Sequence, residues 1–284
     1  MAGSGRGIGK KFVTHLFLVA FTVATLYPVM WVVKLSLTGT QGFTLSLNPI
    51  PEEPTLDNFK DLLTKQDRNG KSLFLRWTIN STLVAGTTTL LGVLLACTAA
   101  YAFSRFRFPG REKGLMAFLV TQMFPGTLMM IPLYVIMDRL GLLNRLLGLA
   151  LVYSTTAIPF CVWMLKGYFD TIPRELEDAA RIDGASTFRI FWTIMLPLAK
   201  PAIAVTALFS FMTAWNEFIL AATFMSKEEM YTLPVAIQSY VSAYHTEWGH
   251  FAAGSILVSI PVVVLFFALQ KNLVSGLTAG SVKG

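Results

Sequence analysis

The sequence predicts an all-α integral membrane protein. Of its 284 residues, 54% are hydrophobic and only 14% are charged, and the mean hydropathy of +0.58 lies outside the range of a soluble domain. A helix needs about 20 residues to cross roughly 30 Å of hydrocarbon, and period-two alternation, which would indicate a barrel, is absent. We expect six transmembrane helices, near residues 13–35, 78–103, 115–137, 146–169, 202–224 and 251–271.

The distribution of positive charge predicts which side of the membrane each connection occupies. Cytoplasmic loops retain Lys and Arg during insertion. With the N-terminus inside, the inner segments hold fourteen of these residues and the outer loops hold eight. We therefore expect a multi-pass membrane protein with both termini in the cytoplasm and residues 1–284 forming a single transmembrane domain. The first apolar run is too long for a signal peptide and should remain as a span.

The first outer loop and the first inner turn have distinct compositions. In the outer loop, about 36–76, Pro49, Pro51 and Pro54 predict irregular structure, and residues 56–63 are expected to form a short helix. The inner turn at 104–111 alternates cations with aromatic rings. Such a segment suits the headgroup region, so membrane lipid is an expected partner.

Prolines fall inside several predicted spans. Each one frees a backbone carbonyl, so we expect a bend or a break at Pro125, Pro132, Pro159 and Pro261. Because Pro125 is followed by Gly126, the third span is expected to break there, near the middle of the membrane.

A polar stretch between the fourth and fifth spans is the most informative motif of the chain. Pro173 suits a first helical position, and Leu176, Ala179 and Ala180 share one helical face. Asp183 and Gly184 form a turn, after which a second short helix should run to Pro197. A helix-turn-helix in the cytoplasmic loop 170–200, with small residues and an acidic rim, is suited to lie in a groove of another protein. The expected docking residues are Glu177, Asp178, Ala179, Ala180, Asp183 and Gly184.

Glu217 is the one carboxylate predicted inside the membrane. Exposure of that carboxylate to lipid would be costly, so it should face the bundle interior or water. Two roles are open for Glu217: a position near a path through the membrane, which Asn216 would share, and a structural salt bridge or hydrogen bond. The rings of Tyr134, Tyr153 and Trp163 could stack on a sugar and the Asn216 amide could bond to its hydroxyls, but a lipid-facing position or core packing is the better default for each ring taken singly.

The last outer loop, residues 226–250, is rich in tyrosine, amide and hydroxyl groups. This composition suits recognition at a surface, and the expected contacts are Gln238, Ser239, Tyr240 and Tyr244. The alternative is an aromatic belt at the membrane interface.

The sequence also argues against several other classes of function. Residues 3–11 resemble a phosphate-binding loop, but Lys10 is followed by Lys11 where serine or threonine is required. No zinc motif or nucleophile elbow is present, and Cys97 and Cys161 are expected to be buried apolar residues. The net charge of +7 comes without the basic, aromatic-interleaved patch of a nucleic-acid-binding protein. We expect this chain to perform no catalysis and to bind no metal, cofactor or nucleic acid.

The polar stretch resembles the cytoplasmic coupling motif of ABC importer permeases, in which an acid-Ala-Ala triplet is followed by a spaced glycine and then by Ile-x-Leu-Pro. Residues 178–180, Gly184 and residues 194–197 match, although Asp178 stands where glutamate is usual. The turn at 104–110, Trp215-Asn216-Glu217 and the C-terminal tail extend the resemblance over nearly the whole chain. The chain is similar to the smaller permease of maltose/maltodextrin-type ABC importers.

This resemblance implies a complex of the bacterial cytoplasmic (inner) membrane that imports maltose- or maltodextrin-like oligosaccharides, in which residues 1–284 form a single permease domain. The expected partners are a second, different permease subunit, two ATPase subunits and an external solute-binding protein, with ATP and Mg²⁺ bound only by the ATPases. The helix-turn-helix would rest in a cleft of one ATPase, and the loop 226–250 would contact the binding protein. The tail, which ends in Lys283 and Gly284, would reach between the ATPases.

Two alternatives are open. An ABC permease for another sugar or for glycerol phosphate would differ only in its cargo. A secondary transporter would need several intramembrane charges or an inverted repeat, whereas this sequence offers only Glu217.

Overall fold

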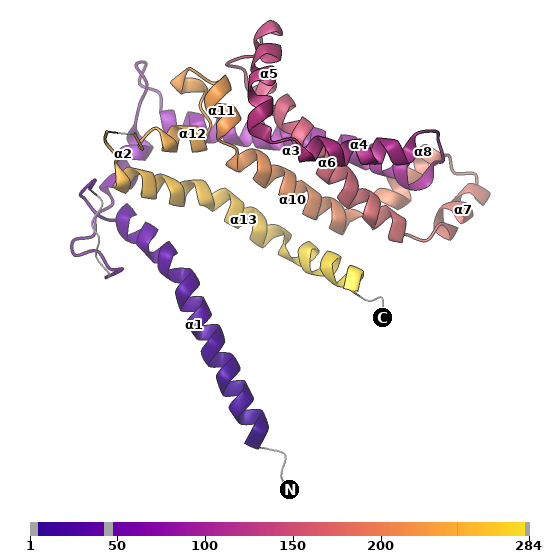
Figure 1. Cartoon of the computed structure of the whole chain (residues 1–284), viewed down its shortest axis with the longest axis horizontal. Helices are drawn as coiled ribbons and strands as arrows, with labels where there is room; N and C mark the ends of the chain where they lie inside the picture. The colour runs from indigo at the N-terminus through magenta and orange to yellow at the C-terminus, as the bar shows by residue number, and fades with distance from the viewer. Residues whose placement is uncertain (1–4, 43–47, 243, 282–284) are drawn as a thin grey trace. The chain divides into compact units, whose positions relative to one another are not determined.

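The computed structural model describes residues 5–42, 48–242 and 244–281, and these residues form helices without a strand (Figure 1). The all-α fold class is confirmed for this part of the chain. The elements are α1 (Gly5–Ser36), α2 (Asp57–Thr64), α3 (Leu73–Arg105), α4 (Arg111–Met123), α5 (Gly126–Arg139), α6 (Leu146–Thr171), α7 (Glu175–Ile182), α8 (Thr187–Ile190), the π-helix η1 (Phe191–Met195), α9 (Leu196–Leu198), α10 (Lys200–Asn216), α11 (Ile219–Phe224), the 3-10 helix η2 (Glu228–Met230), α12 (Leu233–Gln238) and α13 (Trp248–Ser281).

Among the described residues, four helices are long and apolar enough to cross a membrane. They are Lys10–Ser36 within α1, all of α3, all of α6, and Trp248–Gln270 within α13. Two pairs of helices also pass the same test but are sharply bent, by 99° between α4 and α5 and by 77° where α8–α9 meets α10. The total is six if each bent pair is one span.

The break in the third predicted span lies at Pro125, as expected. Phe124 is extended, with ψ 126°, because a residue that precedes proline is disfavoured in the helical region. The helix therefore ends at Met123, and a new helix begins at Gly126. Pro132, Pro159 and Pro261 lie within continuous helices, so those prolines do not break the chain's helices.

The fifth predicted span is interrupted. The run expected over 202–224 divides into α10, which ends at Asn216, and α11, which begins at Ile219. Glu217 between them is extended, with ψ 129°. At the C-terminal end of the chain, α13 continues past the predicted end at 271 to Ser281, since no proline follows Pro261 to stop it.

The described residues pack as two compact units. The first holds residues up to 74 together with 237–259, and its core joins Leu62 of α2, Ile237 and Ala253. The short helix expected over 56–63 is present as α2. Gly254 permits the close approach of α13, because a Cβ there would lie 2.4 Å from the Cδ1 of Ile237.

The second unit holds residues 75–236 and 260 onward, and α6 lies at its centre. Both α4 and α10 pack against α6. The main core cluster joins side chains of α3, α6 and the segment from α8 to α9, including buried Tyr101, Phe169 and Phe191. In Figure 1, α7 and α8 lie at one end of this unit and α11 lies at the other. Cys97 and Cys161 are buried and free, as predicted.

Candidate functional site

The polar stretch forms the predicted helix-turn-helix, which we call the coupling segment (residues 175–190). The helix α7 ends in a Schellman motif, in which the Gly184 N–H donates to the Arg181 carbonyl (3.0 Å) and the Ala185 N–H donates to the Ala180 carbonyl (2.9 Å). Gly184 adopts φ +79°, a left-handed conformation that favours glycine. The next helix begins after Ser186, whose side chain accepts from the Arg189 N–H. Gly184, through its left-handed backbone, and Ser186, through its N-cap, therefore define the turn between α7 and α8.

Glu177 points into the protein. Its side chain is 1% exposed and forms an ion pair with Arg105, the last residue of α3, whose side chain is 4% exposed. The Tyr101 hydroxyl donates a second hydrogen bond to the same carboxylate at 3.0 Å. Glu177 thus anchors α7 to the end of α3, and its predicted role in coupling stays a prediction.

Asp178, Ala179 and Asp183, by contrast, are exposed, and Ala180 is half-buried against the core. Asp178 pairs at 2.6 Å with Arg181, on the surface. Large apolar side chains accompany these residues, because Ile182 is 87% exposed and Phe188 is 72% exposed. Exposed apolar side chains beside an acidic rim are typical of a surface that meets another protein. Arg105 was missed as a site residue because its partner lies 72 positions away in the sequence.

The break after α10 brings together Glu217 and Tyr153. The Glu217 carboxylate accepts the N–H groups of Leu220 (2.8 Å) and Ala221 (3.1 Å) at the start of α11, and it also accepts the hydroxyl of Tyr153 from α6. The structural hydrogen bond considered for Glu217 is therefore present. Asn216 is exposed, and its side chain has no polar partner among the residues that the structure describes.

The first part of the loop predicted to lie outside, residues 226–236, is attached to α3 within the second unit. The Trp77 indole N–H donates to the Glu228 carbonyl (2.9 Å), and the Asn80 amide donates to the carbonyls of Glu229 and Tyr231 (both 3.0 Å). These bonds hold the beginning of the loop in a defined conformation.

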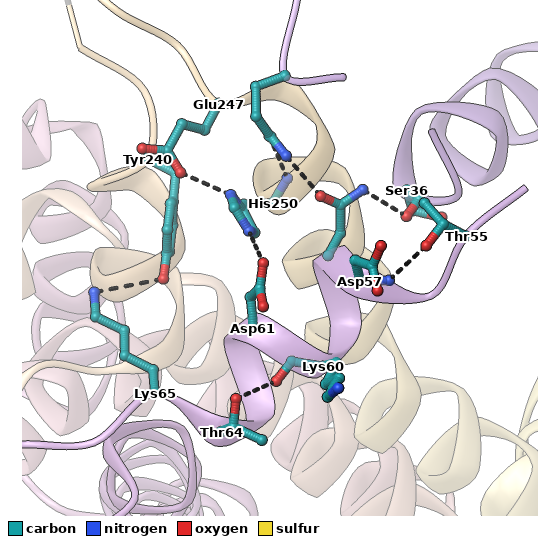
Figure 2. Close-up of polar contacts among 12 residues, drawn as sticks. Ser36, Thr55, Asp57, Lys60, Asp61, Thr64, Lys65, Tyr240, Glu247 and His250 are labelled. Carbon is teal, nitrogen blue, oxygen red and sulfur yellow. Dashed lines mark hydrogen bonds and ion pairs between the residues drawn. The ribbon is translucent and has the colours of Figure 1, made fainter. Parts of the chain in front are cut away.

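The remainder of the loop belongs to the first unit, where it closes over α2 (Figure 2). His250 lies between two carboxylates, with Nδ1 2.7 Å from Glu247 and Nε2 3.3 Å from Asp61. The Lys65 ammonium lies 5.1 Å from the centroid of the Tyr240 ring and 3.5 Å from its hydroxyl. Asp61 within α2 and Lys65 just after it therefore take part in holding the loop.

The four predicted contact residues of this loop differ in exposure. Tyr244 is fully exposed and Ser239 is exposed, whereas Gln238 is half-buried and Tyr240 packs against the core of the first unit. An open depression of about 360 Å³ beside Tyr244 is lined by Gln41, Ser242, His245, Thr246 and Trp248, among others. Lys283 and Gly284 lie outside the described residues.

Comparison with known proteins defines the class. The fold is similar to that of a bacterial ABC transporter involved in the import of the acidic polysaccharide alginate, with a TM-score of 0.78 at 23% identity over 96% of this chain and 99% of that one. Residues 88–278 match the family model of binding-protein-dependent transport system inner membrane components, and the chain belongs to this family. It is therefore a multi-pass membrane permease component of a transport system.

Its relatives are similar over nearly their whole length. The maltodextrin transport system permease protein MdxG of Bacillus subtilis is 39% identical over 97% of each chain. The galactooligosaccharides transport system permease protein GanQ of the same organism is 41% identical over 95% of each. The maltose/maltodextrin transport system permease protein MalG of Escherichia coli is 38% identical over 97% of this chain and 96% of its own.

Proposed function

We propose that this chain is the transmembrane permease subunit of an ATP-driven ABC importer for maltose- or maltodextrin-like oligosaccharides. The observation that carries the proposal is the coupling segment, a short helix pair braced from inside and exposing acidic and apolar side chains at one end of the second unit. Its relatives named as maltose or maltodextrin permeases support the choice of sugar.

In this proposal the coupling segment docks on an ATPase subunit in the cytoplasm. Asp178, Ala179 and Asp183 face outward, where a partner can reach them. Ala180 and Gly184 permit close approach of backbone to backbone, since neither carries a bulky side chain. Two ATPase subunits bind ATP and Mg²⁺, and the permease binds no cofactor. The chain termini lie in the cytoplasm, and the tail that ends in Lys283 and Gly284 approaches the ATPases.

On the outer side, a solute-binding protein delivers the sugar to this subunit and to a second, different permease. Tyr244 and Ser239 are accessible to such a partner, and Gln238 and Tyr240 shape the surface behind them. A solved alginate transporter of similar fold, with a TM-score of 0.68 at 14% identity, is in complex with an alginate pentasaccharide-bound periplasmic protein.

The translocation path passes the break between α10 and α11. A discontinuous membrane helix exposes polar groups where solutes cross. The Asn216 amide is exposed there, and Glu217 fixes the start of α11. We therefore assign sugar contact to Asn216 and a supporting role to Glu217.

A second cargo is favoured by one specific observation. The relative named as a galactooligosaccharide permease is 41% identical, slightly more than the maltodextrin permease at 39%. Binding of maltotriose and of a galactotriose to the cognate solute-binding protein distinguishes the two sugars. Maltotriose is the expected ligand, and a preference for galactotriose would assign the importer to the second cargo.

The importer itself is tested by purifying the full chain from its native membrane, where two copies of an ATPase should accompany it. In proteoliposomes, Ala179→Glu should abolish uptake because the added side chain prevents close docking, whereas Glu175→Gln on the same helix should not. Uptake that survives Ala179→Glu would contradict the docking assignment.

A further inference from the structure

Arg105 ends α3 and is bound on more than one side. Its Nε pairs with Glu177 of α7, and one terminal nitrogen donates to the Ile172 carbonyl at 2.8 Å. The other terminal nitrogen lies 3.2 Å from the Ser104 hydroxyl, which itself donates to Asp170 at 2.6 Å. The guanidinium therefore connects the end of α3 both to Ile172, which precedes α7, and to Glu177 within α7.

Both charges of this pair are nearly inaccessible to water. Because a buried charge that loses its partner is strongly unfavourable, the pair resists separation while the segment moves. The Tyr101 ring adds packing, with its centroid 6.2 Å from that of Phe169 and 5.0 Å from that of Phe191. The coupling segment is thus bonded to α3 as well as being joined through the chain to α6 and α10.

The other ion pairs of α7, among the residues that the structure describes, involve a side chain at the surface. Asp178 pairs with Arg181, and the two side chains are 64% and 47% exposed, so that pair is weak and screened by solvent. Glu177 also lies 3.5 Å from Arg181, but among the described residues Arg105 is the one buried cation that meets its carboxylate, and the Tyr101 hydroxyl of the same helix α3 donates to it at 3.0 Å. The Arg105 ion pair is therefore the charged part of the link between α7 and α3, and the Tyr101 hydrogen bond supports it.

We propose that Arg105 is a positioning residue for energy coupling, which holds α7 and the cytoplasmic end of α3 together as one rigid body through Glu177. This inference rests on the proposed function, in which α7 receives the motion of an ATPase. Glu177 then acts by holding α7 in place and makes no direct contact with the ATPase. Arginine suits this role, because its planar guanidinium donates to the Glu177 carboxylate and to the Ile172 carbonyl at the same time.

The rigid link is tested by a distance measurement in the complete transporter. Spin labels are placed at Ile182→Cys in α7 and Leu95→Cys in α3, both exposed positions, in a background carrying Cys97→Ala and Cys161→Ala. The distance distribution should be narrow with native Arg105 and should broaden with Arg105→Met. Arg107→Met is the matched control, because Arg107 is exposed and has no polar partner among the described residues.

Coupling is measured as sugar taken up per ATP hydrolysed. Arg105→Met and Glu177→Gln should each lower this ratio by roughly 2- to 30-fold, the range seen for residues that modulate coupling between sites. The Arg105→Met/Glu177→Gln double variant should be no worse than Arg105→Met alone, because it removes both charges together. Arg105→Lys should recover part of the ratio, since it keeps the ion pair with Glu177.

Two results would overturn the inference: an unchanged, narrow distance distribution in Arg105→Met, or losses that add in the double variant, as they would if Glu177 contacted the ATPase independently. Failure of the proposed function has a different signature. If Ala179→Glu left uptake intact, docking of the coupling segment would be disproved, while the distance distribution would still decide whether Arg105 links α7 to α3.

Discussion

The hydroxyl of Tyr153 donates a hydrogen bond to the carboxylate of Glu217, and this contact joins α6 to the interruption between α10 and α11. The same carboxylate accepts two backbone N–H groups at the start of α11. A helix that begins within a protein leaves N–H groups without intrahelical partners, and here Glu217 supplies the acceptor. The interruption is therefore a stabilised feature of the fold.

Tyr153→Phe should weaken this junction without abolishing it, because the two backbone donors remain. We expect the free energy of unfolding to fall by about 1 kcal/mol, within the range measured for polar contacts inside membranes. Thermal unfolding of the purified protein in detergent measures the change. Tyr134→Phe is the matched control, since Tyr134 is 42% exposed and its hydroxyl has no partner among the described residues. Equal effects of both substitutions would contradict the assigned role of Tyr153.

The break at Pro125 could be predicted from sequence, whereas the break at Glu217 could not. Proline acts locally, through its missing N–H and its effect on the preceding residue. Glu217 ends a helix only because Tyr153, 64 residues away, and the start of α11 give its carboxylate three donors. The distinction is between local backbone chemistry and contacts made in the folded chain.

The coupling segment also combines a feature that the local sequence predicts with one that depends on contacts in the folded chain. The turn at Asp183 and Gly184 was predicted correctly because a left-handed residue after a helix has a clear sequence signal. Spacing alone did not reveal that Glu177 is buried while its neighbour Asp178 is exposed. That difference depends on where α3 ends, which brings Arg105 against one face of α7.

Gly249→Ala should destabilise the first unit. A Cβ at this position would lie 2.7 Å from the side-chain amide atoms of Asn58. Asn58 cannot move aside cheaply, because it donates to the carbonyls of Ser36 and Thr38 and accepts from Gln41. We expect a loss of roughly 1–3 kcal/mol, as for other overpacked interiors.

Thermal unfolding checks the Gly249→Ala prediction, with Gly167→Ala in α6 as its control. No atom lies within 4 Å of a Cβ added at Gly167, so this helical substitution should be neutral or slightly stabilising. If Gly249→Ala also proved neutral, the packing of Asn58 against the start of α13 would be wrong.

Two tyrosines of the loop 226–250 should respond differently to truncation. Tyr240→Ala removes a ring that packs on the core beside Lys65 and His250, so it should lower stability by about 2 kcal/mol. Tyr244→Ala removes a fully exposed ring and should change stability by less than about 0.5 kcal/mol. Under the proposed function, Tyr244→Ala should nevertheless reduce stimulation of ATP hydrolysis by the binding protein. Full stimulation with normal stability would remove Tyr244 from that interface.

Asp178→Ala separates docking from folding most cleanly. The side chain is 64% exposed and its pair with Arg181 lies at the surface, so its loss should cost no more than about 1 kcal/mol of stability. If Asp178 faces an ATPase, uptake should nevertheless fall several-fold while the purified chain unfolds at nearly the same temperature. Asp183→Ala makes a useful comparison, since Asp183 is also exposed but caps the end of α7. Normal uptake by Asp178→Ala proteoliposomes would show that the acidic position of the motif makes no contact that matters for transport.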